Sequence, residues 1–255
     1  MVHVFIGCDH IVGRKVAFFE HVSAVEIQET ARGGVTDRAL SRWRTDSPKG
    51  FCFVMHAVRG VGTVLGTRSP EWIGDADIEG GGLLRDTPAV RASWDETLRV
   101  AAKLRPKVIL VRTPAAFTPT PAHRARVEWF ARELAPMAGI SVAFEPHGLW
   151  QPETWVPWAR ELGLVPVFDP FVEPDLPIAP GGTMMLTIYD PFGPKTGFSD
   201  YEVEELLERI EPLQRAIIIF RGQRQYRDAR IAHEVWQALA EMDEDQDFAA
   251  MDEEE

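Results

Sequence analysis

Short apolar runs alternate with longer helical segments along most of the chain. The apolar runs are Val2–Gly7, Ala24–Gln28, Phe51–His56, Val108–Val111, Ser141–Phe144, Val165–Phe168, Met184–Ile188 and Ala216–Phe220. The segments predicted as helices are Arg14–His21, Asp37–Arg44, Ser93–Leu104, Pro121–Leu134, Glu153–Leu162, Asp200–Ile210 and Asp228–Leu239. No interior run alternates polar and apolar residues, as a strand with one solvated face would, so the pattern predicts a parallel sheet covered by helices.

Eight strands in about 240 residues favour a single closed (β/α)8 TIM barrel spanning residues 1–240. A doubly wound open sheet is the alternative fold. Residues 57–91 are rich in glycine and are predicted to be an irregular insertion after the third strand. This insertion is interpreted either as a lid over the site or as a surface insertion with a small helix.

Composition excludes several classes of partner. Residues 241–255 hold nine acids and no Lys or Arg, and removing these nine charges from the net −12 leaves −3. The acidic segment is predicted to be a disordered tail, and the nearly neutral remainder lacks the basic stripe of a nucleic-acid-binding protein. No apolar run is long enough to cross a membrane, and no secretory signal is recognised. Cys8 and Cys52 are predicted to be reduced core residues of a cytoplasmic protein.

Polar residues stand at or near the ends of the predicted strands, where a TIM barrel carries its functional site. They are Asp9, Glu26, Gln28, His56, Arg112, Glu145, His147, Asp169, Tyr189 and Arg221, and Trp150 follows as a wall residue of the same pocket. Because these ends meet at one rim, the sequence predicts a site there for a small molecule.

The residue types favour acid/base chemistry on a small polar or anionic metabolite. Arg112 and Arg221 are predicted to bind a carboxylate or phosphate, together with Asp9, Gln28, Glu145, Trp150 and Tyr189 as binding residues. The predicted catalytic groups are Glu26, Asp169, His56 and His147. A structural alternative pairs Glu26 with Arg112, and Asp169 with Arg221, as charge-balanced plugs of the barrel.

Two other functions stay open. Glu26, His56, Glu145, His147 and Asp169 would suit a divalent metal in an isomerase or a phosphoesterase, although their spacing is not diagnostic of a metal site. A barrel kept only for binding, without catalysis, is the second alternative. The sequence identifies no cofactor and does not settle whether the protein is an enzyme.

The strand motifs resemble those of the YecE-like family, a domain of unknown function built as a TIM barrel. Val25–Gln28 reads V-E-I-Q beside the family's V-E-I-N, and Ile6–His10 stands at the family's G-T-S-G-W. His147 and Trp150 match the H-x-x-W of its fifth strand, and Asp169 matches its sixth-strand aspartate.

The resemblance spans nearly the whole chain, but the chain departs from it at several pocket positions. His56 replaces a lysine, Arg112-Thr113-Pro114 replaces Q-x-P, Thr187 stands where an arginine is expected, and Phe220-Arg221-Gly222 replaces F-N-N. The fifth strand has Phe144 and Pro146 where the family has a glutamate and an arginine. The resemblance therefore implies the fold, while no activity follows from it.

Overall fold

The computed structural model describes residues 2–63, 80–189 and 198–252. Eight parallel strands form a closed barrel in chain order: β1 (His3–Cys8), β2 (Ala24–Ile27), β3 (Cys52–His56), β4 (Val108–Thr113), β5 (Ser141–Pro146), β6 (Val165–Phe168), β7 (Thr183–Ile188) and β8 (Arg215–Phe220). Closure comes from the pairing of β1 with β8, which runs from His3 beside Arg215 to Cys8 beside Phe220. The predicted (β/α)8 barrel is therefore confirmed, and the open sheet is wrong.

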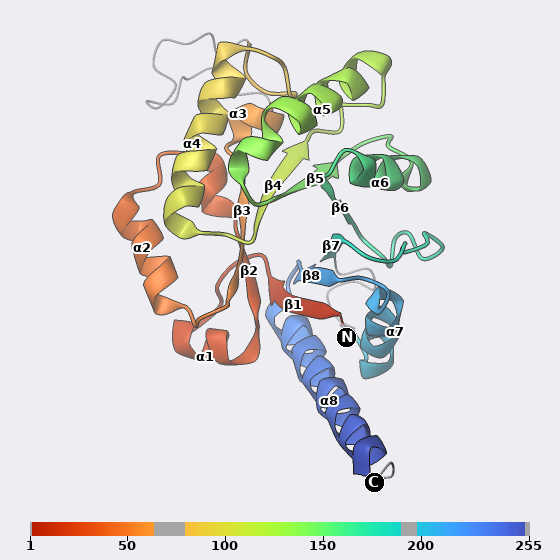
Figure 1. The fold of residues 1–255 in the computed structure, drawn as a ribbon. Helices are drawn as coiled ribbons and strands as arrows, with labels where there is room; N and C mark the ends of the chain where they lie inside the picture. Colours follow the sequence, from red (N-terminus) through yellow and green to blue (C-terminus); the bar gives the residue numbers. More distant parts are fainter. Residues whose placement is uncertain (1, 64–79, 190–197, 253–255) are drawn as a thin grey trace.

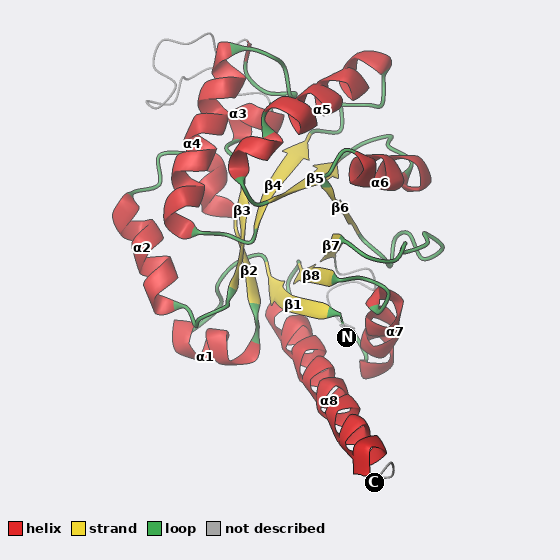
Figure 2. Ribbon diagram, in the orientation of Figure 1, coloured by secondary structure: helices red, strands yellow, loops and turns green. Residues whose placement is uncertain are grey.

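Helices surround this ring of strands (Figures 1 and 2). They are α1 (Lys15–His21), α2 (Asp37–Asp46), α3 (Arg59–Gly62), α4 (Pro88–Leu104), α5 (Pro121–Glu133), α6 (Pro152–Glu161), α7 (Asp200–Ile210) and α8 (Gln225–Asp252), with the 3₁₀ helices η1 (Gln28–Arg32) and η3 (Ala135–Ala138). The connection from β6 to β7, which is described throughout, contains no helix. Side-chain oxygens of Thr36, Thr87, Thr120 and Ser199 accept hydrogen bonds at four helix starts, which satisfies backbone N–H groups there.

Two apolar regions hold the barrel together. Side chains on alternate strand positions, among them Phe5, Val54, Leu110, Val167 and Ile217, fill the barrel interior. The other strand positions pack against the helices in a larger cluster. The strands are thus buried on both faces, as their unbroken apolar runs indicate. Cys8 and Cys52 are free thiols in these buried regions, which confirms the prediction of reduced core residues for both.

Gly7 allows the first two strands to approach closely. A Cβ at this position would lie 1.8 Å from the carbonyl oxygen of Ala24 on β2. Only a residue without a side chain fits this contact, so Gly7 fixes the packing of β1 against β2.

Two segments differ from the sequence prediction. Helix α4 begins at Pro88, inside the stretch predicted to be irregular, because Thr87 caps it and proline suits a first helical position. Residues 64–79 of the predicted insertion lie outside the described residues.

The second difference is at the C-terminus. Helix α8 continues to Asp252, where the sequence predicted a disordered tail from residue 241. The segment includes Glu, Gln, Ala and Met residues, which are strong helix formers and favour helix despite the charge. The end of α8 extends beyond the barrel (Figure 1).

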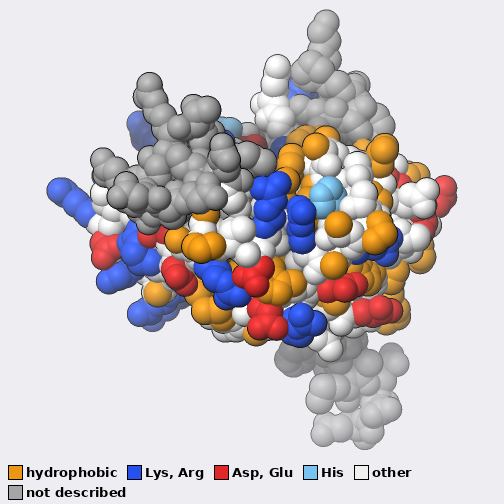
Figure 3. All heavy atoms as spheres, turned by 90° about the horizontal axis from the view of Figure 1, so that it is seen from above, with side chains coloured by type: hydrophobic (Ala, Val, Ile, Leu, Met, Phe, Trp, Pro, Cys, Tyr) orange, Lys and Arg blue, Asp and Glu red, His pale blue; other side chains and the backbone are white. Residues whose placement is uncertain are grey.

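None of the described helices is both long enough and apolar enough to cross a membrane. On the face shown in Figure 3, Lys and Arg side chains are interspersed with acidic and hydrophobic ones over the described part of the surface.

Candidate functional site

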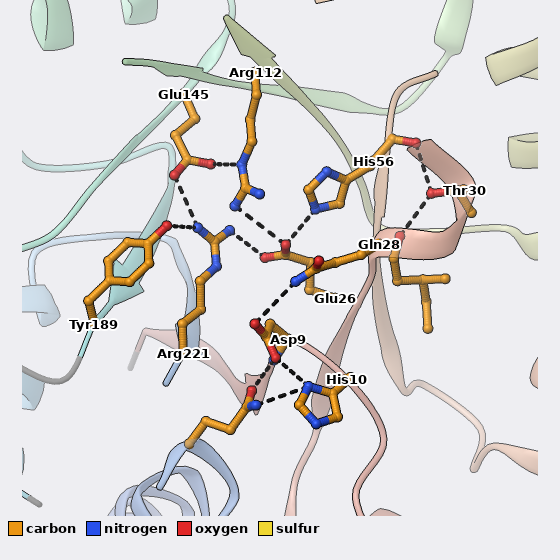
Figure 4. A network of polar contacts seen from close by, with 12 residues as sticks. Asp9, His10, Glu26, Gln28, Thr30, His56, Arg112, Glu145, Tyr189 and Arg221 are labelled. Atoms are coloured by element: carbon orange, nitrogen blue, oxygen red, sulfur yellow. Dashed lines mark hydrogen bonds and ion pairs between the residues drawn. The ribbon is translucent and has the colours of Figure 1, made fainter. Parts of the chain in front are cut away.

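Glu26 lies at the centre of a polar network at the C-terminal end of the barrel (Figure 4). It stands on the interior face of β2, two residues after Ala24, and its side chain is fully buried. Its Oε1 accepts a hydrogen bond from Nε2 of His56 at 2.5 Å, and its Oε2 accepts one from Nη2 of Arg221 at 2.6 Å. Nη2 of Arg112 lies 3.4 Å from Oε1. A fully buried carboxylate is tolerated here because three donors surround it.

Glu145 is the second acid of the network. It lies beside Arg112 in the register of β4 and β5, and the Nε of Arg112 donates to its Oε2. Its Oε1 accepts a hydrogen bond of 3.2 Å from Nη1 of Arg221. Burial raises the pKa of Glu145, although the charge of Arg112 opposes this.

The two carboxylates in turn stabilise the charge on Arg112. Burial acts to lower the pKa of Arg112, but Glu145 and Glu26 together raise it above its usual value. Arg112 therefore remains a cation, and its side chain is 23% exposed, so part of it can reach a ligand.

Arg221 joins the acids to Tyr189. Its Nη1 donates to the Tyr189 hydroxyl at 2.5 Å, and its guanidinium carbon lies 5.3 Å from the centre of the Tyr189 ring. Burial, helped by the charge of Glu145, raises the pKa of Tyr189 to about 12, so the phenol stays protonated at neutral pH. The Nε of Arg221 and the hydroxyl of Thr187 are buried, and neither has a hydrogen-bond partner among the described residues.

His56 lines a cavity, and its ring nitrogen Nδ1 is not bound to Glu26. In Figure 4 this nitrogen points away from the Glu26 carboxylate. The cavity has a volume of about 210 Å³, and its polar lining residues are Gln28, His56, Arg59, Thr63 and Arg112. With Nε2 donating to Glu26, Nδ1 is the acceptor nitrogen of the ring.

A second hollow adjoins the first and shares Gln28 and Arg59 with it. It has a volume of about 500 Å³, and Asp9, His10, Glu29 and Arg32 complete its lining. The carboxylate of Asp9 accepts a hydrogen bond of 3.1 Å from Gln28 and lies 2.6 Å from Nδ1 of His10. The predicted binding residues Asp9 and Gln28 therefore form the wall of this hollow rather than part of the central network.

Asp169 does not join the central network. Its oxygens accept hydrogen bonds from the backbone N–H groups of Phe171 at 2.9 Å and Tyr189 at 3.0 Å. Burial raises its pKa, and these N–H groups oppose the rise. The proposed pairing of Asp169 with Arg221 is wrong, because the carboxylates bound to Arg221 are those of Glu26 and Glu145. The proposed contact of Glu26 with Arg112 is present.

Of the two remaining predicted residues, Trp150 lies apart from the network and His147 lies at its edge. Trp150 is packed against Phe117 and Trp158, and its indole N–H donates to the carbonyl oxygen of Phe117. It is a core residue and does not line the described cavities. His147 is half-exposed, with its Nε2 3.9 Å from Oε1 of Glu145. Burial and the charge of Arg112 lower the pKa of His147.

Sequence reasoning missed three residues that shape the site. Arg59 of α3 lines both hollows. Gln225, at the start of α8, accepts from the backbone N–H of Asp9 at 2.8 Å. The hydroxyl of Thr30 donates to the carbonyl oxygen of His56 at 2.9 Å and so holds the end of β3. All three stand in the first turn or two of a helix after a strand end, and proximity to that end is the signal that could have found them.

The donor set does not suit a metal ion. Among the residues that the structure describes, no three His, Cys, Asp or Glu side chains are grouped so that they could hold one. The guanidinium groups of Arg112 and Arg221 lie between the carboxylates of Glu26 and Glu145 (Figure 4). A divalent cation bridging these acids would have to displace a guanidinium group.

Comparison with known proteins supports the fold but identifies no activity. No protein-family model matches the chain, and no curated protein does either. Among solved structures, a DUF72 family protein from Enterococcus faecalis V583 is similar, with a TM-score of 0.63 and 14% identity over 93% of this chain and 98% of that one. A DUF72 family protein from Thermotoga maritima MSB8 has a TM-score of 0.62 and 15% identity over 93% and 99% of the two chains.

Endonuclease IV from Thermus thermophilus is a more distant neighbour. Its TM-score is 0.51 at 15% identity, over 92% of this chain and 99% of that one. At such low identities the similarity is one of fold. The chain therefore has the TIM-barrel architecture of these proteins over nearly its full length.

Proposed function

We propose that this chain is a distant member of the DUF72 family. This is the same family as the YecE-like family, which its strand motifs resemble. The proposal rests on the DUF72 structures among its neighbours and on V-E-I-Q at the end of β2. We further propose that it binds a small anionic metabolite at the C-terminal rim and removes a proton from it. The observation that carries this proposal is the Glu26–His56 pair beside a cavity flanked by two arginines.

His56 is the proposed base. Glu26 fixes the orientation and the tautomer of its ring through Nε2, and Nδ1 is left to accept a proton from a molecule in the cavity. A carboxylate that holds a histidine in this way also stabilises the imidazolium that forms. Positioned bases of this kind contribute about 10²–10⁴-fold to a rate.

Arg112 and Arg59 are the proposed anion-binding residues. Arg112 is bound to Glu145 through its Nε but is partly exposed, and Arg59 is exposed at the wall shared by both hollows. A guanidinium group suits a carboxylate or a phosphate because its N–H groups match two oxygens at once. A volume of about 210 Å³ is below the usual range for drug-sized ligands, so the bound group is small, and the larger hollow accommodates any extension of it.

The experiment is a thermal-shift screen with organic acids and sugar phosphates, repeated on two variants. Arg112→Met should abolish the shift that the best ligand gives to the wild-type protein. His56→Gln keeps a donor toward Glu26, so it should retain the ligand shift and lose any proton exchange between ligand and solvent. Exchange is measured by NMR as deuterium incorporation into the ligand in D₂O.

Arg132→Met is the matched control, because Arg132 lies on the surface and pairs only with its neighbour Glu133 among the described residues. It should leave both readouts unchanged. A ligand shift that persists in Arg112→Met would refute the anion-binding role. Binding without any exchange in the wild-type protein would instead support a barrel that binds but does not catalyse.

A further inference from the structure

Another pocket lies at the opposite end of the barrel, where the strands begin. It has a volume of about 460 Å³ and is lined by Arg44, Gly50, Phe51, Arg105, Pro106, Lys107, Ile140, Ser141 and Arg215. Four of these residues carry a positive charge, and none carries a negative one. In a chain with a net charge of −12, four cations around one pocket require an explanation.

The four cations converge from different segments of the chain. Arg44 stands in the last turn of α2, and Arg105 follows the end of α4. Lys107 precedes β4, and Arg215 begins β8. Convergence of separate segments makes this a feature of the folded barrel rather than a local charge run.

None of the four cations forms an ion pair with a carboxylate of the described residues. Arg44 donates to the carbonyl oxygen of Phe51 and lies over the ring of Phe53. The Nε of Arg215 is buried and has no hydrogen-bond partner in the part of the chain that the structure describes. Since no carboxylate of the described residues neutralises them, the four charges favour an anion in the pocket.

Helix ends account for only part of this arrangement. Cations near helix C-termini interact favourably with the last carbonyl groups, and this explains Arg44 and Arg105. It does not explain Lys107 and Arg215, which belong to strand starts. Both of these charges act on Cys52 in the barrel interior, where they oppose the effect of burial, which raises the pKa of that thiol to about 12. Both residues therefore lie near the floor of the barrel, where the strands begin.

We propose that this pocket binds a phosphate group, either free or as part of a small phosphorylated molecule. Arg44, Arg105 and Arg215 supply guanidinium forks, and Lys107 supplies a compact ammonium charge, a combination suited to a multivalent oxyanion. The bound phosphate neutralises the crowded positive charge. The site is distinct from the rim, which lies at the other end of the strands.

The test is isothermal titration of the full chain with inorganic phosphate and with pyrophosphate, at an ionic strength held constant with KCl. Arg215→Met and Lys107→Met should each raise the dissociation constant about tenfold, because each removes one charge-assisted contact. Arg132→Met should leave it unchanged. Arg112→Met distinguishes this pocket from the rim, because a loss of phosphate affinity in that variant would place the bound anion at the rim.

Thermal unfolding with and without phosphate separates binding from a structural role. If the cations bind phosphate, phosphate raises the midpoint of the wild-type protein and has little effect on Arg215→Met, which is no less stable than the wild type when phosphate is absent. Equal losses of stability with and without phosphate would mean that the cations only support the fold. Phosphate binding that survives Arg215→Met and Lys107→Met but is lost in Arg112→Met would place the anion at the rim and overturn the inference, while leaving the proposed function intact.

Discussion

Replacing Arg221 with methionine tests whether the charged network holds the barrel mouth together. Arg221 is 4% exposed and binds both buried acids, through Nη2 to Glu26 at 2.6 Å and through Nη1 to Glu145 at 3.2 Å. Methionine is similar in length and apolar, so it fills the space without the charge. The variant leaves Arg112 as the one guanidinium group of the described network facing two carboxylates.

The expected loss of stability follows from the contacts removed. Hydrogen bonds to charged groups contribute about 1.5–3 kcal/mol each, and Arg221 makes two of them to carboxylates. Removing one partner of a buried ion pair costs about 3–5 kcal/mol, which agrees with this range. For a chain of this size, a loss of about 4 kcal/mol lowers the melting temperature by roughly 10 °C.

The loss should depend on pH, with a sign that can be worked out. Without Arg221, Glu145 loses a cation at 3.2 Å, and its pKa in the folded variant rises further above the unfolded value of about 4.3. A raised pKa contributes stability that is present below the unfolded value and is lost as the pH rises through the folded one. Since the pKa of Glu145 is already raised by burial in the wild type, the variant should approach wild-type stability near pH 4 and show its full deficit near pH 7.

The assay is urea unfolding followed by circular dichroism at several pH values. The double variant Arg221→Met with Glu26→Gln is the control, because it removes one of the stranded charges and should recover part of the stability at neutral pH. A deficit below about 1 kcal/mol at pH 7, or one that does not change with pH, would show that the network contributes little to stability.

Three other outcomes are expected. In a spectrophotometric titration, one tyrosine should ionise near pH 12, later than an ordinary phenol, and Tyr189→Phe should remove that late step. Burial raises the pKa values of Cys8 and Cys52 to about 12, so both thiols should resist iodoacetamide at pH 8 in the folded protein and react once it is unfolded. Rapid labelling of the native chain would contradict their buried position. Trp150→Phe should cost about 1–3 kcal/mol in chemical unfolding, because the carbonyl oxygen of Phe117 loses its donor, yet leave the ligand response intact; loss of that response would return Trp150 to the site.

Much of the fold could be predicted because parallel strands carry an unambiguous signal. The run Ala216–Phe220 is apolar throughout, since its residues face the barrel interior and the helices in turn. Closure could not be read from such runs, because it depends on contacts between β1 and β8, which are the first and last strands of the chain. The count of strands favoured a barrel, but the pairing of His3 with Arg215 is a long-range fact that no local pattern contains.

The site shows where reasoning from strand ends succeeds and where it fails. Glu26, His56, Arg112, Glu145 and Arg221 stand at the ends of strands, so the barrel brings them together as the sequence indicated. Asp169 follows the end of β6, where the chain turns, and its carboxylate binds nearby N–H groups, as aspartate does in many turns. The sequence could not distinguish these two outcomes, because both present an acid directly after an apolar run.

Arg112 and Arg221 differ in how far their side chains are exposed, and this difference gives them different roles in the network. Charges alternate around the rim, with acids on β2 and β5 and guanidinium groups on β4 and directly after β8, so each acid lies against a cation and the network balances its own charge. A ligand must then use what this pairing leaves accessible. Arg221 is almost fully buried, while the side chain of Arg112 is 23% exposed and lines the cavity beside His56. Arg221 therefore stabilises the rim and Arg112 is available to an anion, which is why loss of Arg221 should weaken the fold and loss of Arg112 should weaken binding first.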